Sequence, residues 1–400
     1  MKQQYSDCIY QWELNQNVTF LNHGSFGACP RSILQFQSQL RAKMELEPVK
    51  FLARELEDLL DEARSALARF IGASFENLCF VPNATTGINT VLRSLEFKTD
   101  DELLVTNHEY NATRNALNFV AQRAKAKVIV AKIPFFLDSS EAIISAIIDN
   151  ISERTKLVLL DHVTSPTGII FPIQKLVNIL NDRGIDTLID GAHAPGMLPL
   201  NLNEIGATYY TGNCHKWMCA PKGAAFLFVR EDKKDLIRPL AISHGANQIS
   251  LKRSRFQMEF DWTGTYDPTP YLCIPKAIDF LNSLLPGGAN NLMENNSNLA
   301  RLAREKICKY LQILPPIPAE LIGSLATIPL PQYPNYSGDN DTLQAKLYSR
   351  YSLEVPIIPW PSLSARFIRV SAFAYNHISQ YEYLARSLQQ LLAEENLKTK

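Results

Sequence analysis

The chain has 400 residues, 46% of them hydrophobic, and this length predicts one large domain with a smaller companion. Forty Lys and Arg balance forty Asp and Glu, which argues against nucleic acid or an anionic membrane as a partner. No apolar run approaches the ~20 residues of a membrane span, and the first residues lack the pattern of a signal peptide. Seven scattered cysteines without CxxC pairs argue against a disulfide framework or a metal site, and predict a reduced, cytoplasmic protein.

From about residue 77, short apolar runs alternate with helical patterns. The predicted strands cover 78–81, 103–106, 128–130, 157–160 and an apolar run that ends at 190; the predicted helices cover 87–95, 112–125, 141–150 and 173–183. Continuous β-branched and leucine runs indicate strands that are covered on both faces, as in a parallel sheet with helical crossovers. This alternation predicts a doubly wound α/β sandwich.

The character of the sequence changes after about residue 265. Three prolines surround the start of a predicted long helix that ends at 286–288, and the remainder mixes helices with short strands at 326–328 and 366–370. A last helix is expected from Gln380. We therefore expect an N-terminal segment (1–20), a large α/β domain (21–265) and a small C-terminal α+β domain (266–400).

Polar groups follow several of the predicted strands, at the edge where ligands bind in open α/β sheets. The turn 82–87 opens a helix, and Thr85 and Thr86 there could seat a phosphate, although such a turn is also an ordinary helix cap. The loop 107–111 offers His108 and Tyr110 as rings that could stack on a flat cofactor, or is a solvated loop. The turn 161–168 offers hydroxyl groups, or is a plain turn.

Two strand ends carry the most specific signal. Asp190 closes an apolar strand, and a buried carboxylate there requires a cationic partner, unless it only caps the turn at Gly191. Lys216 follows the next apolar strand in a His-Lys pair beside Trp217, which is not the setting of a solvated lysine. A lysine that holds an aldehyde as a Schiff base and an aspartate that keeps a ring nitrogen protonated are what pyridoxal 5′-phosphate (PLP) enzymes need.

A late strand contributes the third element of this pattern. Arg366 and Arg369 stand three residues apart on it, and therefore on opposite faces. One of them can point inward and bind an α-carboxylate with two hydrogen bonds. The alternative is that both arginines lie at the surface.

With these motifs, the chain resembles the class V branch of fold type I PLP enzymes, which includes aminotransferases, cysteine desulfurases, C–S lyases and isopenicillin N epimerase. The resemblance runs from Leu-Asn-His-Gly-Ser-Phe-Gly at 21–27 through Trp-Thr-Gly-Thr at 262–265 to 368–371, and is greatest to the isopenicillin N epimerase-like and cysteine C–S lyase group. It implies a large, mostly parallel seven-stranded sheet domain with a smaller α+β domain.

The resemblance also implies roles for individual residues. Lys216 would be the Schiff-base lysine, Asp190 the partner of the pyridine nitrogen, and Tyr110 the stacking ring, with His108 as its alternative. Arg369 would bind the substrate carboxylate. Other implied contacts are to the phenolic oxygen (His193 and Thr164 or Ser165), the phosphate (Thr85, Thr86, Asn213 and His215) and the substrate (Asn22 and His23).

Relatives place the threonine of the Gly-Thr pair at the neighbouring subunit's phosphate, so Thr265 implies a homodimer with shared active sites. Two positions depart from the pattern: Asn213 stands where relatives carry Ser or Thr, and Tyr266 replaces an arginine that is frequent in the epimerase-like group. The loss of that cation puts the substrate of that group in question for this chain.

The expected activity is Cα deprotonation of an amino acid or its derivative by the freed Lys216, in a C–S lyase or an epimerase. Transamination on the same fold is the alternative, and a catalytically silent binding protein is a third. Persulfide-forming desulfurases need a mobile cysteine in the small domain, and this chain has none after Cys308. The substrate side-chain pocket is expected to involve the loops 243–260 and 333–340.

Overall fold

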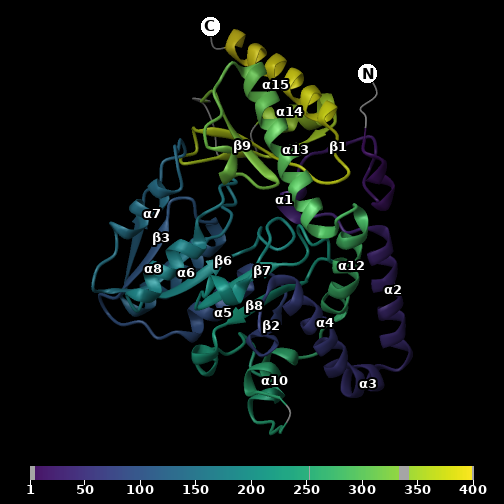
Figure 1. Ribbon diagram of the computed structural model, residues 1–400, viewed down its shortest axis with the longest axis vertical. Helices are drawn as coiled ribbons and strands as arrows, with labels where there is room; N and C mark the ends of the chain where they lie inside the picture. The colour runs from purple at the N-terminus through teal and green to yellow at the C-terminus, as the bar shows by residue number, and fades with distance from the viewer. Residues whose placement is uncertain (1–4, 252, 333–341, 399–400) are drawn as a thin grey trace.

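The computed structural model describes residues 5–251, 253–332 and 342–398. A layered α/β part holds the largest sheet, and a smaller part with β9, α13, α14 and α15 lies beside it (Figure 1). Within the described ranges the largest sheet has seven strands in the order β2-β8-β7-β6-β5-β3-β4. Its strands are β2 (Leu78–Val81), β3 (Glu102–Thr106), β4 (Lys127–Ala131), β5 (Thr155–Asp161), β6 (Asp186–Asp190), β7 (Tyr209–Asn213) and β8 (Ala225–Val229).

The sheet is parallel except for β8, which runs antiparallel to both β2 and β7. The predicted mostly parallel seven-stranded sheet is therefore confirmed. Parallel pairing brings the carboxyl ends of neighbouring strands to one edge, and the register aligns Asp161 with Asp190. The predicted strand bounds agree with the observed ones to within two residues for 78–81 and 103–106.

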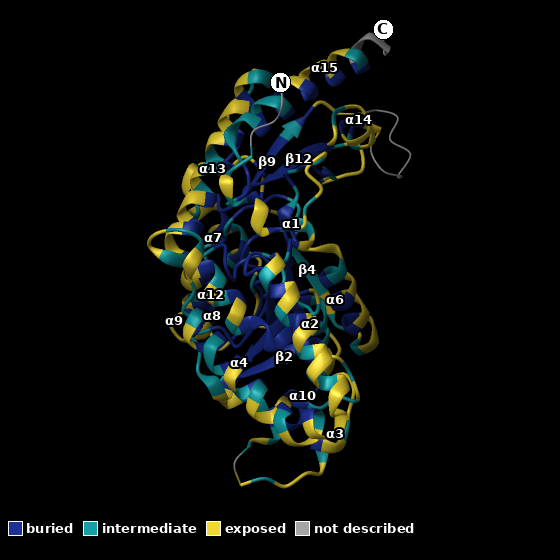
Figure 2. Cartoon of the chain, turned by 90° about the vertical axis from the view of Figure 1, so that its right-hand side faces the viewer, coloured by how far each residue is buried: buried dark blue, intermediate teal, exposed yellow. Residues whose placement is uncertain are grey.

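Alternating side chains of the sheet enter two separate cores. Cys79, Leu103 and Leu157 point to one core, whereas Leu78, Leu104 and Val158 point to the other. Helices α5 (Ala84–Ser94), α6 (Asn111–Ala124) and α10 (Arg255–Asp261) cover the first face. The second face is covered by α4 (Leu56–Ile71), α7 (Glu141–Ile148), α8 (Ile173–Asp182) and α12 (Ile274–Leu284). Both faces of the inner strands are consequently buried (Figure 2), as their apolar sequences predicted, whereas the edge strand β4 is only partly buried.

Helix α5 approaches the sheet closely at one point. A Cβ atom on Gly87 would lie 2.3 Å from Oγ1 of Thr211 on β7, so only glycine fits there. The helix begins at Ala84, three residues before its predicted start, because Asn83 caps it through its side chain. This cap brings the first turn of α5 to the carboxyl edge of the sheet.

The N-terminal third adds helices that the sequence analysis did not assign. They are α1 (His23–Phe26), α2 (Arg31–Leu46), α3 (Pro48–Lys50), the π-helical turn Phe51–Glu55 and α4, together with the 3-10 turns 7–11 and 75–77. Later in the chain, the short α9 (Leu202–Ile205) and the 3-10 turns 231–236, 244–246 and 319–321 were not assigned either. The predicted long helix after Pro268 is two helices, α11 (Thr269–Leu272) and α12, because the chain turns at Cys273.

A buried ion-pair network joins α4 to the segment that ends α10. The fully buried guanidinium of Arg64 binds Asp61 at 2.5 Å and Asp261, and Arg253 binds the same two carboxylates. Arg64 also stacks against the rings of Phe75 and Phe80. The network thereby fixes the residue that directly precedes the Trp-Thr-Gly-Thr motif.

The C-terminal part contains a three-stranded antiparallel sheet in the order β11-β12-β9. Its elements are β9 (Leu325–Leu330), β10 (Leu353–Glu354), β11 (Ile357–Pro359), β12 (Arg366–Ser371), α13 (Gly288–Leu311), α14 (Thr342–Tyr351) and α15 (Ile378–Lys398). The short strand β1 (Thr19–Phe20) pairs in parallel with β10, so the start of the chain packs on this part. The division at residues 20 and 265 stays a prediction. Within the described ranges, none of the helices combines the length and apolar composition needed to span a bilayer.

Candidate active site

A cavity of about 550 Å³ lies where the carboxyl ends of β2, β5, β6 and β7 meet the C-terminal part. Lys216, Asp190, His193 and Arg369 all line it, although they are far apart in the sequence. Thr85, Tyr110, Ser165, Asn213 and His215 also reach it. The structure thus brings most of the residues singled out from the sequence into a single cavity.

The amine of Lys216 is buried and contacts His193. Its Nζ atom lies 3.2 Å from Nε2 of His193, and the indole N–H of Trp217 points to Nδ1 of the same ring at 3.3 Å. An indole N–H can only donate, so Nδ1 accepts and the proton of the neutral imidazole resides on Nε2. Nε2–H then points at the lone pair of an uncharged lysine amine.

Burial favours the uncharged form of both groups. Desolvation, together with the nearby Arg369, lowers the pKa of Lys216 to about 8. The pKa of His193 is held well below its usual value, mainly by burial and then by Lys216. Near neutral pH a larger fraction of this lysine is therefore uncharged than of a solvated lysine, and the uncharged amine is the form that attacks an aldehyde or accepts a proton.

Asp190 ends β6 and points into the cavity. Its carboxylate accepts hydrogen bonds from the backbone amide of Ala192 at 2.9 Å and from the hydroxyl of Thr113 at 3.1 Å. Burial raises its pKa, and these two bonds oppose that shift. Thr113 is a residue that the sequence analysis missed; it lies on the first turn of α6, three residues after Tyr110.

A polar end of the cavity lies at the N-terminus of α5. Asn213 accepts a hydrogen bond from the amide of Ala84 at 2.8 Å. His215 donates its Nδ1–H to the carbonyl of Ala224 at 3.0 Å. Thr85 lines the cavity. Thr86 does not, because its amide and hydroxyl both bind the capping Asn83.

Tyr110 and His108 are separated by the fold. Tyr110 lines the cavity, whereas His108 is fully buried behind it, between Oγ1 of Thr167 and the carbonyl of Ile133. The His108 ring packs on Trp360 with centroids 4.3 Å apart. The alternative that His108 stacks on a cofactor is therefore wrong for this structure, since it is not at the cavity wall.

The turn after β5 shows a similar separation. Ser165 lines the cavity, while Thr164 turns inward and bonds Thr167 at 2.6 Å and the amide of Ile169. Of the two hydroxyl groups considered from the sequence, Thr164 is thus used to hold its own turn.

The two arginines of β12 point in opposite directions, as their spacing predicted. Arg366 points away from the cavity and forms an ion pair with Glu395 at 3.0 Å. Arg369 enters the cavity, where it donates to the carbonyl of Ser165 and, at 3.1 Å, to the hydroxyl of Ser25. Its Nε atom is buried without a hydrogen-bond partner among the described residues, and burial lowers its pKa to about 10. A buried cation with spare donors suits a carboxylate ligand.

The N-terminal motif reaches the cavity through different residues than expected. Asn22 binds Glu354 and Ser25, and His23 is buried between the hydroxyl of Tyr375 and the carbonyl of Lys216. Neither lines the cavity; Gly24, Ser25 and Phe26 do. The expectation that Asn22 and His23 border the substrate is therefore corrected, because both side chains hold the motif against the Lys216 loop.

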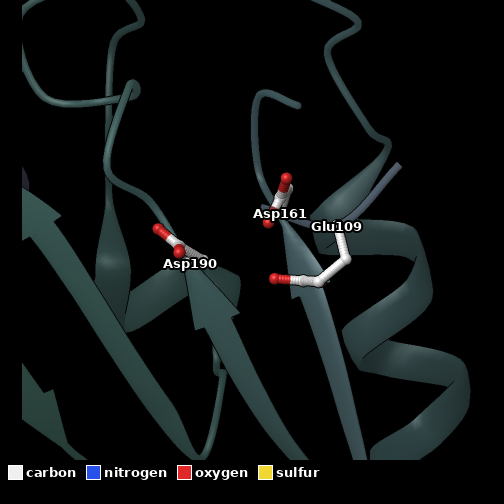
Figure 3. A group of neighbouring side chains, drawn as sticks. All are labelled: Glu109, Asp161 and Asp190. Carbon is white, nitrogen blue, oxygen red and sulfur yellow. The ribbon is translucent and has the colours of Figure 1, made fainter. Parts of the chain in front are cut away.

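Two further carboxyl groups at this edge were missed. Asp161 ends β5 next to Asp190, and Glu109 approaches both from the loop before α6 (Figure 3). One oxygen of each of the three groups lies within 4.8 Å of the others. Asp161 could have been found, since it closes an apolar strand as Asp190 does, but the sequence gives no sign of the approach of Glu109.

Thr265 is exposed and does not line this cavity. Tyr266, which stands in place of an arginine of the epimerase-like group, donates its hydroxyl to the carbonyl of Asp261 at 3.1 Å. This hydrogen bond holds Tyr266 against the residue that precedes the Trp-Thr-Gly-Thr motif. The loop 333–340, expected near the substrate, lies outside the described residues.

The residues present fit PLP. The cavity combines a buried amine of lowered pKa, a carboxylate for a ring nitrogen, a flat ring and a polar helix N-terminus for a phosphate. Arg369, with spare buried donors, leaves room for a substrate carboxylate beside them.

Comparisons with known proteins agree with this geometry. Residues 31–335 match the family described as aminotransferase class-V. The chain is 33% identical to isopenicillin N epimerase of Amycolatopsis lactamdurans over 395 residues, which are 95% of this chain and 97% of that protein. It is 25% identical to an L-cysteine desulfhydrase of Arabidopsis thaliana, over 94% of this chain and 88% of that one.

The fold also matches a solved structure of the cystine C–S lyase C-DES with its product cysteine persulfide. The TM-score is 0.80 at 19% identity, over 93% of this chain and 97% of that one. The chain belongs to the class-V aminotransferase family and is a PLP-dependent enzyme of fold type I.

Proposed function

We propose that this enzyme removes the Cα proton of a cysteine-type amino acid and expels the sulfur group from Cβ, as a C–S lyase. The observation that carries the proposal is the buried amine of Lys216, with a pKa lowered to about 8, in a cavity that also holds Asp190 and Arg369. When bound, PLP supplies an aromatic ring that takes up the electron pair released at Cα.

Arg369, Lys216 and Asp190 would each have a separate role in this reaction. Arg369 binds the substrate carboxylate through its spare donors and so orients the bonds at Cα. Lys216 would accept the Cα proton, and its uncharged form is favoured by burial. Asp190 holds the proton of the ring nitrogen by its negative charge.

The remaining residues of the cavity would position the cofactor. We assign Tyr110 to the ring face, and His193 and Ser165 to the phenolic oxygen. The phosphate would lie at the N-terminus of α5, between Thr85, Asn213 and His215.

Elimination is proposed because it requires one base and a leaving group, and Lys216 supplies the base. Relatives named L-cysteine desulfhydrase, which cover 94% of the chain, support it. Epimerisation is the second candidate, since the relative of 33% identity is named isopenicillin N epimerase. Tyr266 argues against epimerisation, because it occupies the position of an arginine that is frequent in that group. Transamination is the third outcome open to the same residues.

The test follows sulfide, pyruvate and ammonia from L-cysteine and L-cystine, and Cα deuterium incorporation in heavy water. We expect one sulfide or persulfide product per pyruvate, lost in Lys216→Ala and kept in Lys175→Ala, an exposed lysine paired with Glu141. Exchange at Cα with retention of sulfur and formation of the D-isomer would favour epimerisation instead. Absence of Cα exchange with every amino acid tried would contradict the proposal and support a silent binding protein.

We further propose a homodimer in which Thr265 of one subunit contacts the phosphate bound by the other. The support is that Thr265 is exposed and that Phe26, 74% exposed, stands at the mouth of the cavity. Mixing Lys216→Ala and Thr265→Ala subunits tests it, since a mixed dimer would contain one site with both residues intact. Recovery of activity to well above either parent is expected; no recovery in a proven mixed dimer would refute shared sites. A cytoplasmic location stays a prediction.

A further inference from the structure

Glu109, Asp161 and Asp190 form a trio of buried carboxyl groups at the carboxyl edge of the sheet. Their exposed fractions are 9%, 2% and 4%, and one oxygen of each lies within 4.8 Å of the others. Figure 3 shows the Glu109 side chain reaching from its loop toward the two strand ends that carry Asp161 and Asp190. Asp161 and Asp190 line the PLP cavity, whereas Glu109 borders a second cavity of about 510 Å³.

The three groups have very different partners. Asp190 accepts hydrogen bonds from Ala192 and Thr113. The carboxyl oxygens of Asp161 and Glu109 have no hydrogen bond of normal geometry among the described residues. The backbone amide of Ser165 approaches Asp161 and lowers the pKa of that carboxyl group. Two buried carboxyl groups without a donor are costly if both are ionised.

Cations near the trio do not neutralise it. Lys216 lies on the side of Asp161 and Asp190, but its own pKa is lowered to about 8. Arg114 of α6 faces Glu109, yet its Nη2 atom donates to the carbonyl of Thr106 at 2.7 Å, and it forms no ion pair with Glu109 among the described residues. A proton on one of the two carboxyl groups would supply the donor that the unbonded oxygens lack.

We propose that Glu109 carries a proton at neutral pH and donates it to Asp161, so that these two carboxyl groups together hold one negative charge beside Asp190. Two close carboxyl groups that share a proton are a known solution to like-charge crowding. Burial raises the pKa of both groups, and the contact between them raises the pKa of Glu109 further while lowering that of Asp161. We place the proton on Glu109 because Asp161 shares the PLP cavity with Lys216, which favours the ionised form of Asp161. Glu109 borders the second cavity and can exchange its proton there.

The consequence rests on the proposed function. If Asp161 and Glu109 were both ionised, their charge would drive Asp190 toward its neutral form, which cannot hold the proton of a ring nitrogen. With Glu109 protonated, Asp190 keeps its charge. Glu109 is thus a positioning residue, since it acts through Asp161 and Asp190.

Infrared spectroscopy of the purified full chain loaded with PLP tests the proposal at pH 7.5, where ordinary carboxyl groups with a pKa of about 4 are ionised. We expect the carbonyl band of a protonated carboxyl group in the wild type and its loss in Glu109→Gln. Glu102→Gln is the matched control, because Glu102 is equally buried but pairs with Arg154 and should leave the band unchanged. The infrared measurement does not require turnover, so its result is independent of the result of the C–S lyase assay.

A second measurement uses only the wild-type protein, so its result does not depend on whether the Glu109→Gln variant folds. Carbon-13 labelling of glutamate side-chain carboxyl groups in the wild type should shift the band. Absence of the band, a band unmoved by the label, or a band that survives Glu109→Gln would each overturn the proposal. So would a divalent metal ion bound in a one-to-one ratio and lost in Glu109→Gln, since the trio would then be its ligands.

The positioning role has a readout of its own. Glutamine retains a donor for Asp161, so PLP binding by Glu109→Gln should stay within about threefold of the wild type. Glu109→Ala removes the donor and should weaken PLP binding about tenfold, equal to one pKa unit on Asp190. Equal loss in both variants would contradict the role, because a donor at position 109 would then have no effect.

Discussion

Nε2 of His193 lies 3.2 Å from Nζ of Lys216, and the indole of Trp217 fixes which nitrogen of that imidazole carries the proton. The contact joins the third residue after β6 to the third residue after the neighbouring strand β7. It is compatible with an uncharged lysine, which the lowered pKa of Lys216 also favours.

Replacement of the indole should therefore disturb the imidazole first. In Trp217→Phe we expect nitrogen-15 NMR to show a mixture of His193 tautomers, where the wild type shows the Nε2–H form alone. The loss of one hydrogen bond, about 1 kcal/mol, should lower kcat roughly fivefold and leave KM nearly unchanged. A wild-type spectrum with the proton on Nδ1 would disprove the assigned tautomer.

The pH dependence of PLP loading reports on Lys216. The free amine attacks the aldehyde, and a pKa of about 8 means that about one-tenth of the lysine is free at pH 7. The loading rate of the cofactor-free protein should rise about tenfold from pH 6 to 7 and level off above about pH 8. The stopped-flow absorbance of bound PLP measures it. A rate that still rises at pH 10 would indicate a lysine with an ordinary pKa.

The two arginines of β12 provide a matched pair for substrate binding. Arg369→Ala should raise KM about 100-fold, since a buried charged hydrogen-bond pair is worth about 2–5 kcal/mol when one side is removed. Arg369→Lys should recover only part of this, because an ammonium group cannot form the paired hydrogen bonds of guanidinium.

The control for Arg369 is Arg366→Ala. It breaks the pair with Glu395 on the other face of the strand and should reduce stability while leaving the KM of the folded enzyme unchanged. Steady-state kinetics with parallel thermal melts separates the two effects. A similar rise of KM in both variants would remove the case for a carboxylate site at Arg369.

The ion-pair network of α4 predicts a large effect on folding. Arg64→Ala leaves Asp261 buried without its nearest cation and should lower the free energy of unfolding by about 3–5 kcal/mol. Arg69→Ala, on an exposed position of the same helix, should change it by less than about 0.5 kcal/mol. Urea unfolding at constant pH compares the two. Equal small effects would show that the network contributes little.

The sheet could be predicted because its strands are short apolar runs between helical patterns, and Asp190 and Lys216 stood out as polar residues at their ends. Arg369 was found because a spacing of three on a strand separates two side chains. The choice between Tyr110 and His108 could not be made, since it depends on which ring turns away toward Trp360. Sequence spacing does not give that rotation.

The remaining misses have the same physical origin. Asn22 and His23 stand next to the cavity in the sequence, but α1 turns them onto Glu354 and Tyr375, far away along the chain. Thr86 donates its amide and its hydroxyl to the capping side chain of Asn83, one position after the residue that reaches the cavity. Glu109 meets Asp161 only through tertiary packing, over 52 residues of sequence that contain two helices and two strands.

Reduction of the purified, PLP-loaded protein with borohydride, followed by peptide mapping, tests the central claim most directly. The account predicts that the phosphopyridoxyl group is found on Lys216, in the peptide that also contains His215 and Trp217. The label on another lysine, or a protein that takes up no label, would contradict it.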